Sequence, residues 1–203
     1  MENVYIISAI ISGFFSILVG FGTVLYKTRL DKKAEKDRDK EIESITEKDL
    51  TSMMEIKEFL DDLIAKWKID RGAIFQFHNG GKFFNGIGMK KFSLTHEATA
   101  PGIARVKETN QNIFVTEHPQ LMKRLSENII FSTTIEDPSL DYVRDRYEEQ
   151  GIVQVISVPI RGLNNILLGF VQFYMIKNTL PITQDMEDDL LEGTQRISGY
   201  LHY

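Results

Sequence analysis

The longest hydrophobic stretch of the chain lies at its N-terminus. Residues 3–26 contain no charged side chain, and Lys27 and Arg29 follow at once. A helix of about 20 apolar residues crosses the hydrocarbon core of a bilayer, so this stretch is long enough to span it with some tilt. Inside lipid the backbone N–H and C=O groups have to be satisfied within the segment, which requires a helix. We therefore expect a transmembrane helix over residues 1–26, with the lipid bilayer as a partner.

Two other interpretations of the stretch fit less well. A signal peptide has a basic start, an apolar region of about 7–15 residues and a cleavage site with small residues. Here the chain starts with Met1, Glu2 and Asn3, the stretch is too long, and residues 26–28 (Tyr-Lys-Thr) are not small. A buried helix of a soluble domain is the other alternative, although an uncharged stretch of this length at the extreme terminus suits a core poorly.

The charged residues beside the stretch predict its orientation. The C-terminal side is rich in Lys and Arg up to Lys36, whereas the N-terminal side offers Glu2 and the amino group. Because Lys and Arg near a span stay in the cytoplasm, we expect an outside N-terminus and a cytoplasmic C-terminal domain. Small residues at four-residue spacing, Ser12, Ser16 and Gly20, predict a face on which two such helices associate as a homodimer. Gly and Ser are also common in membrane helices without this role, which is the alternative.

A charged segment connects this stretch to the rest of the chain. Residues 27–52 carry many charges of both signs and contain neither Gly nor Pro. Such a composition is typical of a solvated helix with ion pairs at i,i+4 spacing. The apolar positions are too sparse for a strong heptad seam. We therefore expect a charged helical stalk that forms a weak or dimer-assisted coiled coil.

The remaining residues, 53–203, alternate between helical and strand patterns. Apolar side chains at three- and four-residue spacing predict an amphipathic helix that contains Ile56, Leu60, Leu63 and Trp67. Runs rich in β-branched and aromatic residues predict strands over residues 71–78, 90–97, 129–135, 152–160 and 166–176. Helices are expected over residues 103–109, 119–127 and 137–151, and after a cap at Thr183. Together these elements predict an α+β domain in which helices flank a central antiparallel sheet.

The composition agrees with one globular domain behind an anchor. The sequence is 42% hydrophobic and 26% charged, which is enough apolar material for a core. The roughly 150 residues after the stalk suit a single domain. The formal net charge of −5 gives no reason to expect a nucleic-acid partner. The chain has no cysteine, which excludes disulfides, thiolate nucleophiles and cysteine-bound metals.

The best candidate for a binding site is a glycine-rich loop over residues 78–88. Glycine lets the backbone approach a ligand, while histidine, asparagine and lysine offer hydrogen-bond donors and phenylalanine can stack on a planar ring. The candidate ligand-binding residues are His78, Asn79, Gly80, Gly81, Lys82, Phe83, Asn85 and, on the next predicted strand, His96. The loop is not a phosphate-binding P-loop, because Phe83 follows Gly81-Lys82 where Ser or Thr is required. The alternative is a hairpin whose Phe83 and Phe84 fill the core.

The pattern indicates neither a metal site nor a catalytic site. The four histidines are widely spaced, and a zinc site usually needs three or four such ligands. No serine lies in a Gly-x-Ser-x-Gly motif, and no Ser/His/Asp set is recognisable. His96 alternates with Phe92 and Leu94 on the apolar face of its predicted strand, where a hydrogen-bonded core histidine is the commoner explanation. We therefore expect a protein that is not an enzyme, with its cofactor unknown.

The order of the predicted elements over residues 53–203 resembles that of a GAF-type domain, in the GAF/PAS superfamily. The most specific residues are in the predicted hairpin SVPI-RGLNNI-LLGFVQFY, where Pro159 lies near the end of one strand and Leu168-Gly169 opens the next. PAS-type domains are the nearest alternative. The stretch FHNGGKFFNGIGMKKFSLTHE also resembles small uncharacterised membrane-anchored proteins of large tailed bacteriophages.

The resemblance implies a small-molecule sensing or dimerising module, but it supplies no ligand. GAF domains that bind cyclic nucleotides carry an Asn-Lys-x(n)-Phe-xxx-Asp-Glu pattern, and this chain has only Asn112, Phe114 and Glu117, compressed into six residues. Family members that reduce methionine sulfoxide or attach bilins use cysteines, which this chain lacks. The output is therefore expected to be a partner protein or the chain's own assembly.

Three functions are compatible with these features. The first is a single-pass membrane protein whose cytoplasmic GAF-like domain senses a small molecule or host factor and signals through the stalk or a partner. The second is a structural protein–protein interaction module at the membrane, with no ligand. The third is a holin-like membrane protein, which requires the domain to lie outside the cytoplasm, against the prediction from the flanking charges.

Overall fold

The computed structural model describes residues 27, 32–33, 36, 49–82, 88–140 and 143–201. The chain divides into two compact units, Met1–Thr51 and Ser52–Tyr203, and the second contains the α+β domain. The predicted transmembrane helix lies outside the described residues. Among the described residues, the structure contains no helix that combines the length and the hydrophobicity of a membrane span.

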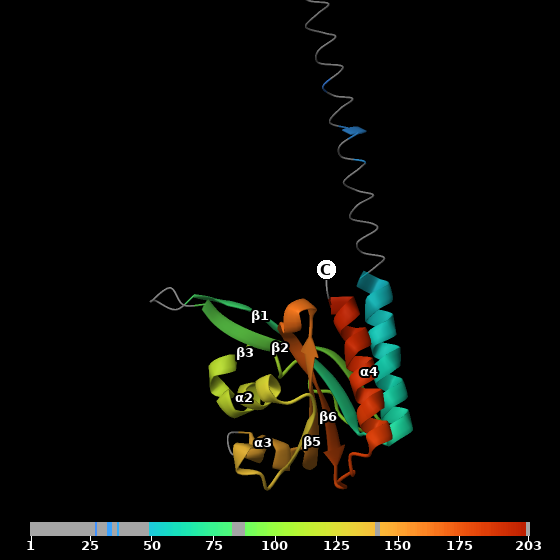
Figure 1. Ribbon diagram of the computed structural model, residues 1–203, viewed down its shortest axis with the longest axis vertical. Helices are drawn as coiled ribbons and strands as arrows, with labels where there is room; N and C mark the ends of the chain where they lie inside the picture. The colour runs from blue at the N-terminus through green and yellow to red at the C-terminus, as the bar shows by residue number, and fades with distance from the viewer. Residues whose placement is uncertain are drawn as a thin grey trace, which may run out of the picture. The chain divides into compact units, whose positions relative to one another are not determined.

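A central antiparallel sheet organises the second unit. The described residues form six strands, ordered β3-β2-β1-β6-β5-β4 (Figure 1). Their bounds are β1 (Arg71–Lys82), β2 (Gly88–Thr99), β3 (Ile113–Phe114), β4 (Phe131–Thr134), β5 (Ile152–Arg161) and β6 (Leu167–Ile176). The inner strands β5 and β6 are buried on both faces, as their nearly continuous apolar sequences predict. The predicted α+β class and antiparallel sheet are therefore confirmed.

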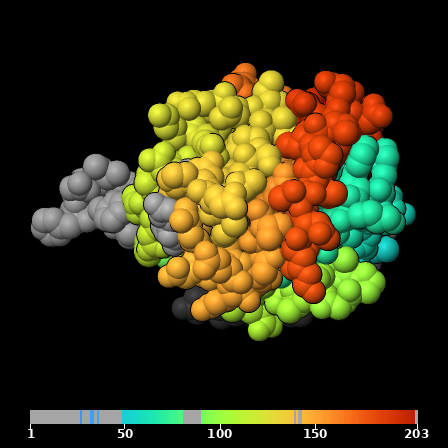
Figure 2. Space-filling model, turned by 90° about the horizontal axis from the view of Figure 1, so that it is seen from below, coloured from blue at the N-terminus to red at the C-terminus, as the bar shows by residue number. Residues whose placement is uncertain are grey.

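Helices cover both faces of the sheet. One face carries the leading helix, described over residues 49–67, and α4 (Gln184–Leu201), which lie side by side in Figures 1 and 2. The other face carries α2 (Pro119–Glu127) and α3 (Arg144–Glu149), with a short 3-10 helix, η1 (Val115–Glu117), before α2. A hydrophobic cluster lies under each layer. The first contains Ile56, Leu60, Ile74, Leu190 and Ile197, and the second contains Phe75, Phe92, Leu125, Tyr147 and Phe170.

The leading helix packs closely against α4. A Cβ on Gly193 of α4 would lie 1.5 Å from the ring of Phe59, so glycine at this position lets the phenylalanine lie over the helix. About one turn before Gly193 on α4, Oδ2 of Asp189 accepts a hydrogen bond from Nε1 of Trp67 at 2.8 Å. The apolar spacing of the leading helix thus predicted its buried face correctly.

The structure corrects the prediction of a helix over residues 103–109, which form turns and irregular backbone instead. The carboxylate of Glu97 accepts hydrogen bonds from the backbone N–H groups of Val106 and Lys107. The guanidinium of Arg71 donates to the carbonyl of Ala104 at 2.9 Å. Because the side chains of Arg71 and Glu97 bind backbone groups of the loop, they replace hydrogen bonds that a helix would make.

The last two predicted helices have different outcomes. Of the helix predicted over residues 137–151, the described residues form η2 (Pro138–Leu140) and α3, and Val143 before α3 has non-helical backbone angles of −123° and 0°. The cap of α4 is confirmed, since the N–H of Met186 donates to Oγ1 of Thr183 at 3.3 Å. The strands β1 and β2 are longer than predicted and extend to Lys82 and from Gly88.

Candidate functional site

The predicted ligand loop lies at the end of the β1–β2 hairpin. His78 and Asn79 are opposite Lys91 and Lys90 of β2. The next three candidates, Gly80, Gly81 and Lys82, continue strand β1. The remaining loop candidates, Phe83 and Asn85, and the adjacent Phe84 lie outside the described residues. The two predictions for this loop, ligand contact and a phenylalanine-filled core, therefore both stay predictions.

The described part of this hairpin extends beyond its neighbouring strands. Pairing of β1 with β6 ends at Gln76 opposite Gly169, and β3 pairs with β2 only at Lys91 and Phe92. Figure 1 shows the ribbon reaching out from the sheet. Nε2 of His78 lies 2.9 Å from Oγ of Ser93 on the opposite strand. The structure thus brings His78 to a partner within the hairpin, and not to His96.

The prediction that His96 lies on the face of Phe92 and Leu94 is wrong. In the β1–β2 register Leu94 is opposite Phe75 but His96 is opposite Ile74, so Thr95 forms a bulge. A bulge adds one residue to the strand and reverses the alternation of side chains beyond it. His96 therefore lies on the opposite face, where it lines an open groove of about 860 Å³ beside the leading helix. Burial and the nearby Lys107 lower the pKa of His96.

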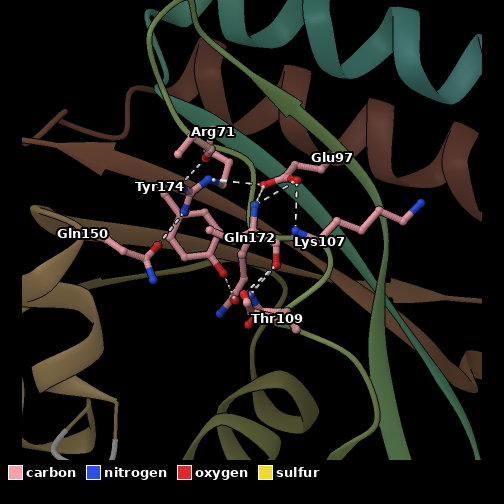
Figure 3. A network of polar contacts seen from close by, with 10 residues as sticks. Arg71, Glu97, Lys107, Thr109, Gln150, Gln172 and Tyr174 are labelled. Carbon is pink, nitrogen blue, oxygen red and sulfur yellow. Dashed lines mark hydrogen bonds and ion pairs between the residues drawn. The ribbon is translucent and has the colours of Figure 1, made fainter.

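A second group of polar side chains converges on Arg71, the first residue of β1 (Figure 3). Its side chain is 3% exposed, and that of Glu97 on β2 is 2% exposed. Nε of Arg71 lies 3.4 Å from Oε1 of Glu97. Nη1 donates to Oε1 of Gln150 at 2.9 Å, and Nη2 donates to the carbonyl of Ala104. One guanidinium thus connects two strands, the loop after β2 and the C-terminal end of α3.

The carboxylate of Glu97 binds the loop as well as Arg71. Oε1 accepts from the N–H of Val106 at 2.9 Å, and Oε2 accepts from the N–H of Lys107 at 3.2 Å (Figure 3). A buried carboxylate is tolerated when it is paired and its oxygens accept hydrogen bonds, and both conditions hold here. The ion pair therefore fixes the loop against the sheet.

Strand β6 contributes two further polar side chains. Tyr174 donates from Oη to Oε1 of Gln172 at 2.6 Å, and Nε2 of Gln172 donates to Oγ of Ser157 at 3.3 Å. The ring of Tyr174 lies 5.5 Å from the guanidinium carbon of Arg71, within the range of a cation–π contact. Burial raises the pKa of Tyr147 and Tyr174, so both hydroxyls are neutral at physiological pH.

A small cavity of about 30 Å³ lies among these side chains. This volume is enough for about one or two water molecules. Its polar lining residues are Arg71, Asn110, His118, Arg146, Tyr147, Gln150, Gln172 and Tyr174, and its apolar ones include Phe75, Phe92 and Ile113. Burial, and then the charge of Arg146, lower the pKa of His118 to about 4, so its imidazole is neutral at physiological pH. We refer to this space as the Arg71 cavity.

Sequence reasoning did not identify the Arg71 cavity. Its residues are far apart in the chain, and Arg71 and Glu97 are simply end residues of two predicted strands. One signal was present: Gln172 interrupts an otherwise apolar strand, and a buried amide requires partners. Among the described residues, no group of three or more His, Cys, Asp and Glu side chains can hold a metal ion.

No model of a protein family matches this sequence, and the sequence of no curated protein matches it either. Solved structures do match the fold. The GAF domain region of a protein from Geobacter sulfurreducens has a TM-score of 0.57 and 12% identity, over 77% of this chain and 97% of that one. A far-red cyanobacteriochrome photoreceptor has a TM-score of 0.57 and 14% identity, over 82% of this chain and 98% of that one.

A third similar structure is the blue-light absorbing form of the PixJ GAF domain of Thermosynechococcus elongatus. Its TM-score is 0.53 and its identity 16%, over 75% of this chain and 88% of that one. At identities this low the likeness concerns the fold alone. The domain therefore has a GAF-like fold, as its hairpin residues and element order predicted.

Proposed function

We propose that this chain is a membrane-anchored regulatory module whose GAF-like domain binds a small molecule and signals through its helical stalk or a docked partner. The observation that carries the proposal is the Arg71 cavity, which is polar, buried and bordered by an irregular loop. A buried ion pair adds little net stability compared with apolar side chains of the same volume. The position of the Arg71–Glu97 ion pair beside a cavity is better explained by a role in ligand binding.

The connection of the cavity to the leading helix supports a signalling role. That helix ends at residue 67, and Asp70 lies directly before Arg71. Asp70 is tied to the sheet on both sides, because its N–H donates to the carbonyl of Tyr174 and its carbonyl accepts from Ala100. A ligand that displaces Arg71 therefore acts on the backbone that ends the leading helix. The output is a shift of that helix in a homodimer or toward a partner protein.

The second candidate function is a protein–protein interaction module at the membrane, without a ligand. The size of the cavity favours it, because ligand pockets usually measure about 300–1,000 Å³ and the Arg71 cavity measures about 30 Å³. A metabolite would have to displace side chains or the loop after β2. The holin-like function is the third candidate and depends on an outside domain.

The membrane topology provides the first test. A reporter that is active only in the cytoplasm, fused after Tyr203, is expected to be active, because Lys and Arg crowd the C-terminal side of the predicted span. A periplasm-active reporter at the same position serves as the control and is expected to be silent. The reverse result would remove the cytoplasmic assignment and favour the holin-like function.

A thermal-shift screen distinguishes the sensor from the interaction module. A metabolite that binds the full-length protein in detergent, at about 100 times its dissociation constant, should add about 2.7 kcal/mol to the free energy of unfolding. Val143→Leu, which fills the Arg71 cavity, should abolish that shift. The control is Val153→Leu, which adds the same group beside the other hydrophobic cluster and should retain the shift. If no metabolite shifts the melting temperature, the interaction module is favoured.

A further inference from the structure

The charged side chains that line the Arg71 cavity are both cationic. The guanidinium groups of Arg71 and Arg146 line it, and no Asp or Glu is among its described lining residues. Arg146 is exposed on α3, at the rim of the cavity. The carboxylate of Glu97 is directed instead to Arg71 and to the loop after β2. Burial is the main cause of the depressed pKa of His118, and the charge of Arg146 lowers that pKa further.

Arg71, which lines the cavity, also has a buried N–H group that lacks a hydrogen-bond acceptor among the described residues. Nε of Arg71 is inaccessible to solvent and makes no hydrogen bond within the described structure. Oε1 of Glu97 balances its charge from 3.4 Å but does not accept from it. Buried N–H groups are nearly always paired, so the hydrogen-bonding capacity of the Arg71 guanidinium is not fully used by the described residues. Gln150 accepts from Arg71 through Oε1, which leaves the N–H donors of its amide for a ligand.

We propose that the Arg71 cavity binds a small carboxylate with a short aliphatic tail, and this proposal rests on the sensory function proposed above. A carboxylate accepts hydrogen bonds from two N–H groups of a guanidinium in the same plane. A neutral ligand forms weaker hydrogen bonds with this group. Phe75, Phe92 and Ile113 form an apolar part of the lining. This part suits an aliphatic tail better than phosphate, which is polar on every side. The cavity volume, enough for one or two water molecules, restricts the ligand to a few heavy atoms, and their entry requires the loop after β2 to move.

Access to the cavity is explained by the same residues. The carboxylate would first meet the exposed Arg146 and then the buried Arg71. Val106 and Asn110 also line the cavity, and they lie in the loop without helix or strand. Because this loop is fixed to the sheet through Glu97 and Arg71, a ligand that binds Arg71 changes how the loop is held. Binding and loop position are therefore coupled.

The experiment uses the full-length protein in detergent micelles. Sodium formate, acetate, propionate and phosphate are titrated at constant ionic strength, with sodium chloride as the reference salt, and thermal unfolding is followed by the fluorescence of the single tryptophan, Trp67. Acetate or propionate is expected to raise the melting temperature saturably. Arg146→Gln should weaken the affinity at least tenfold and leave the melting temperature without ligand unchanged. Lys123→Gln, which removes the same charge from an exposed position of α2 outside the cavity, should have no effect.

The outcomes separate the ligand class from the proposed function. Binding of phosphate without binding of the carboxylates would overturn the ligand class. Equal weakening by Arg146→Gln and Lys123→Gln would also overturn it, because the effect would then be general electrostatics. If neutral metabolites bind and Val143→Leu blocks them while no carboxylate binds, the inference fails and the sensory function stands. If no compound of either kind binds, both fail.

Discussion

Replacement of Arg71 by methionine is expected to lower the free energy of unfolding by about 3–5 kcal/mol, the usual effect of removing one partner from a buried ion pair. The Glu97 carboxylate, 2% exposed, would lose its cationic partner. The carbonyl of Ala104 and the amide oxygen of Gln150 would each lose a donor. Unfolding of the full-length chain in guanidinium chloride measures the loss of free energy, with the midpoint concentration and the slope of the transition both fitted.

Arg105→Met is the matched control for this substitution. Arg105 lies in the loop after β2 and is exposed, so the same chemical change there should alter the free energy of unfolding by less than about 0.5 kcal/mol. A loss below about 1 kcal/mol for Arg71→Met would contradict the expectation. It would mean that the N–H groups of Val106 and Lys107 suffice to stabilise the Glu97 carboxylate.

Substitution of Gly169 by alanine is expected to destabilise the domain by about 3 kcal/mol, at the upper end of typical overpacking effects. A Cβ at this position would lie 2.1 Å from the carbonyl oxygen of Phe75, where β6 meets β1. Backbone cannot move aside without breaking the pairing of these central strands. Because the rings of Phe75 and Phe170 stack at 4.9 Å beside this contact, displacement of β1 would also disturb the aromatic cluster.

Gly72→Ala provides the comparison for Gly169→Ala in the neighbouring strand. The nearest atom to a Cβ on Gly72 is the end of the Leu60 side chain, at 3.2 Å, which can adjust. The expected change in the free energy of unfolding is below about 1 kcal/mol. Urea unfolding followed by near-ultraviolet circular dichroism measures both variants. Equal losses for the two would show that the contact with Phe75 has no special role.

The elements that rest on local patterns were predicted well. The β5–β6 hairpin follows from two apolar runs around a short turn, and the Leu168-Gly169 pair lies at the opening of β6. The α4 cap at Thr183 is likewise a local hydrogen bond. The helix predicted over residues 103–109 failed because its backbone binds the side chains of Arg71 and Glu97, which lie outside the segment. The intrinsic helix propensity of a segment does not account for such contacts.

The candidate site was harder to predict than the fold. His96 was assigned to the wrong face because the bulge at Thr95 leaves no trace in the alternation of apolar residues. The Arg71 cavity draws on β1, β2, α3 and β6, and no spacing within one element indicates that Arg71, Gln150 and Tyr174 meet. The glycine-rich loop was predicted as a binding site because its unusual composition can be recognised within one short segment. That polar residues from distant parts of the chain converge can be recognised only once the order of the strands in the sheet is known.

The sheet order also has a consequence for biosynthesis. The central pair joins β1 to β6, with Arg71 opposite Tyr174, so the two strands that meet in the middle are among the first and the last to be translated. Synthesis proceeds at about 5–20 residues per second, so β1 waits for about 5–20 s before its partner has been made. During that interval the nascent β1–β2 hairpin exposes an unpaired edge, on which strands of other chains can add. Slowed translation between the two strands should therefore favour aggregation, and chaperone binding should concentrate on this hairpin.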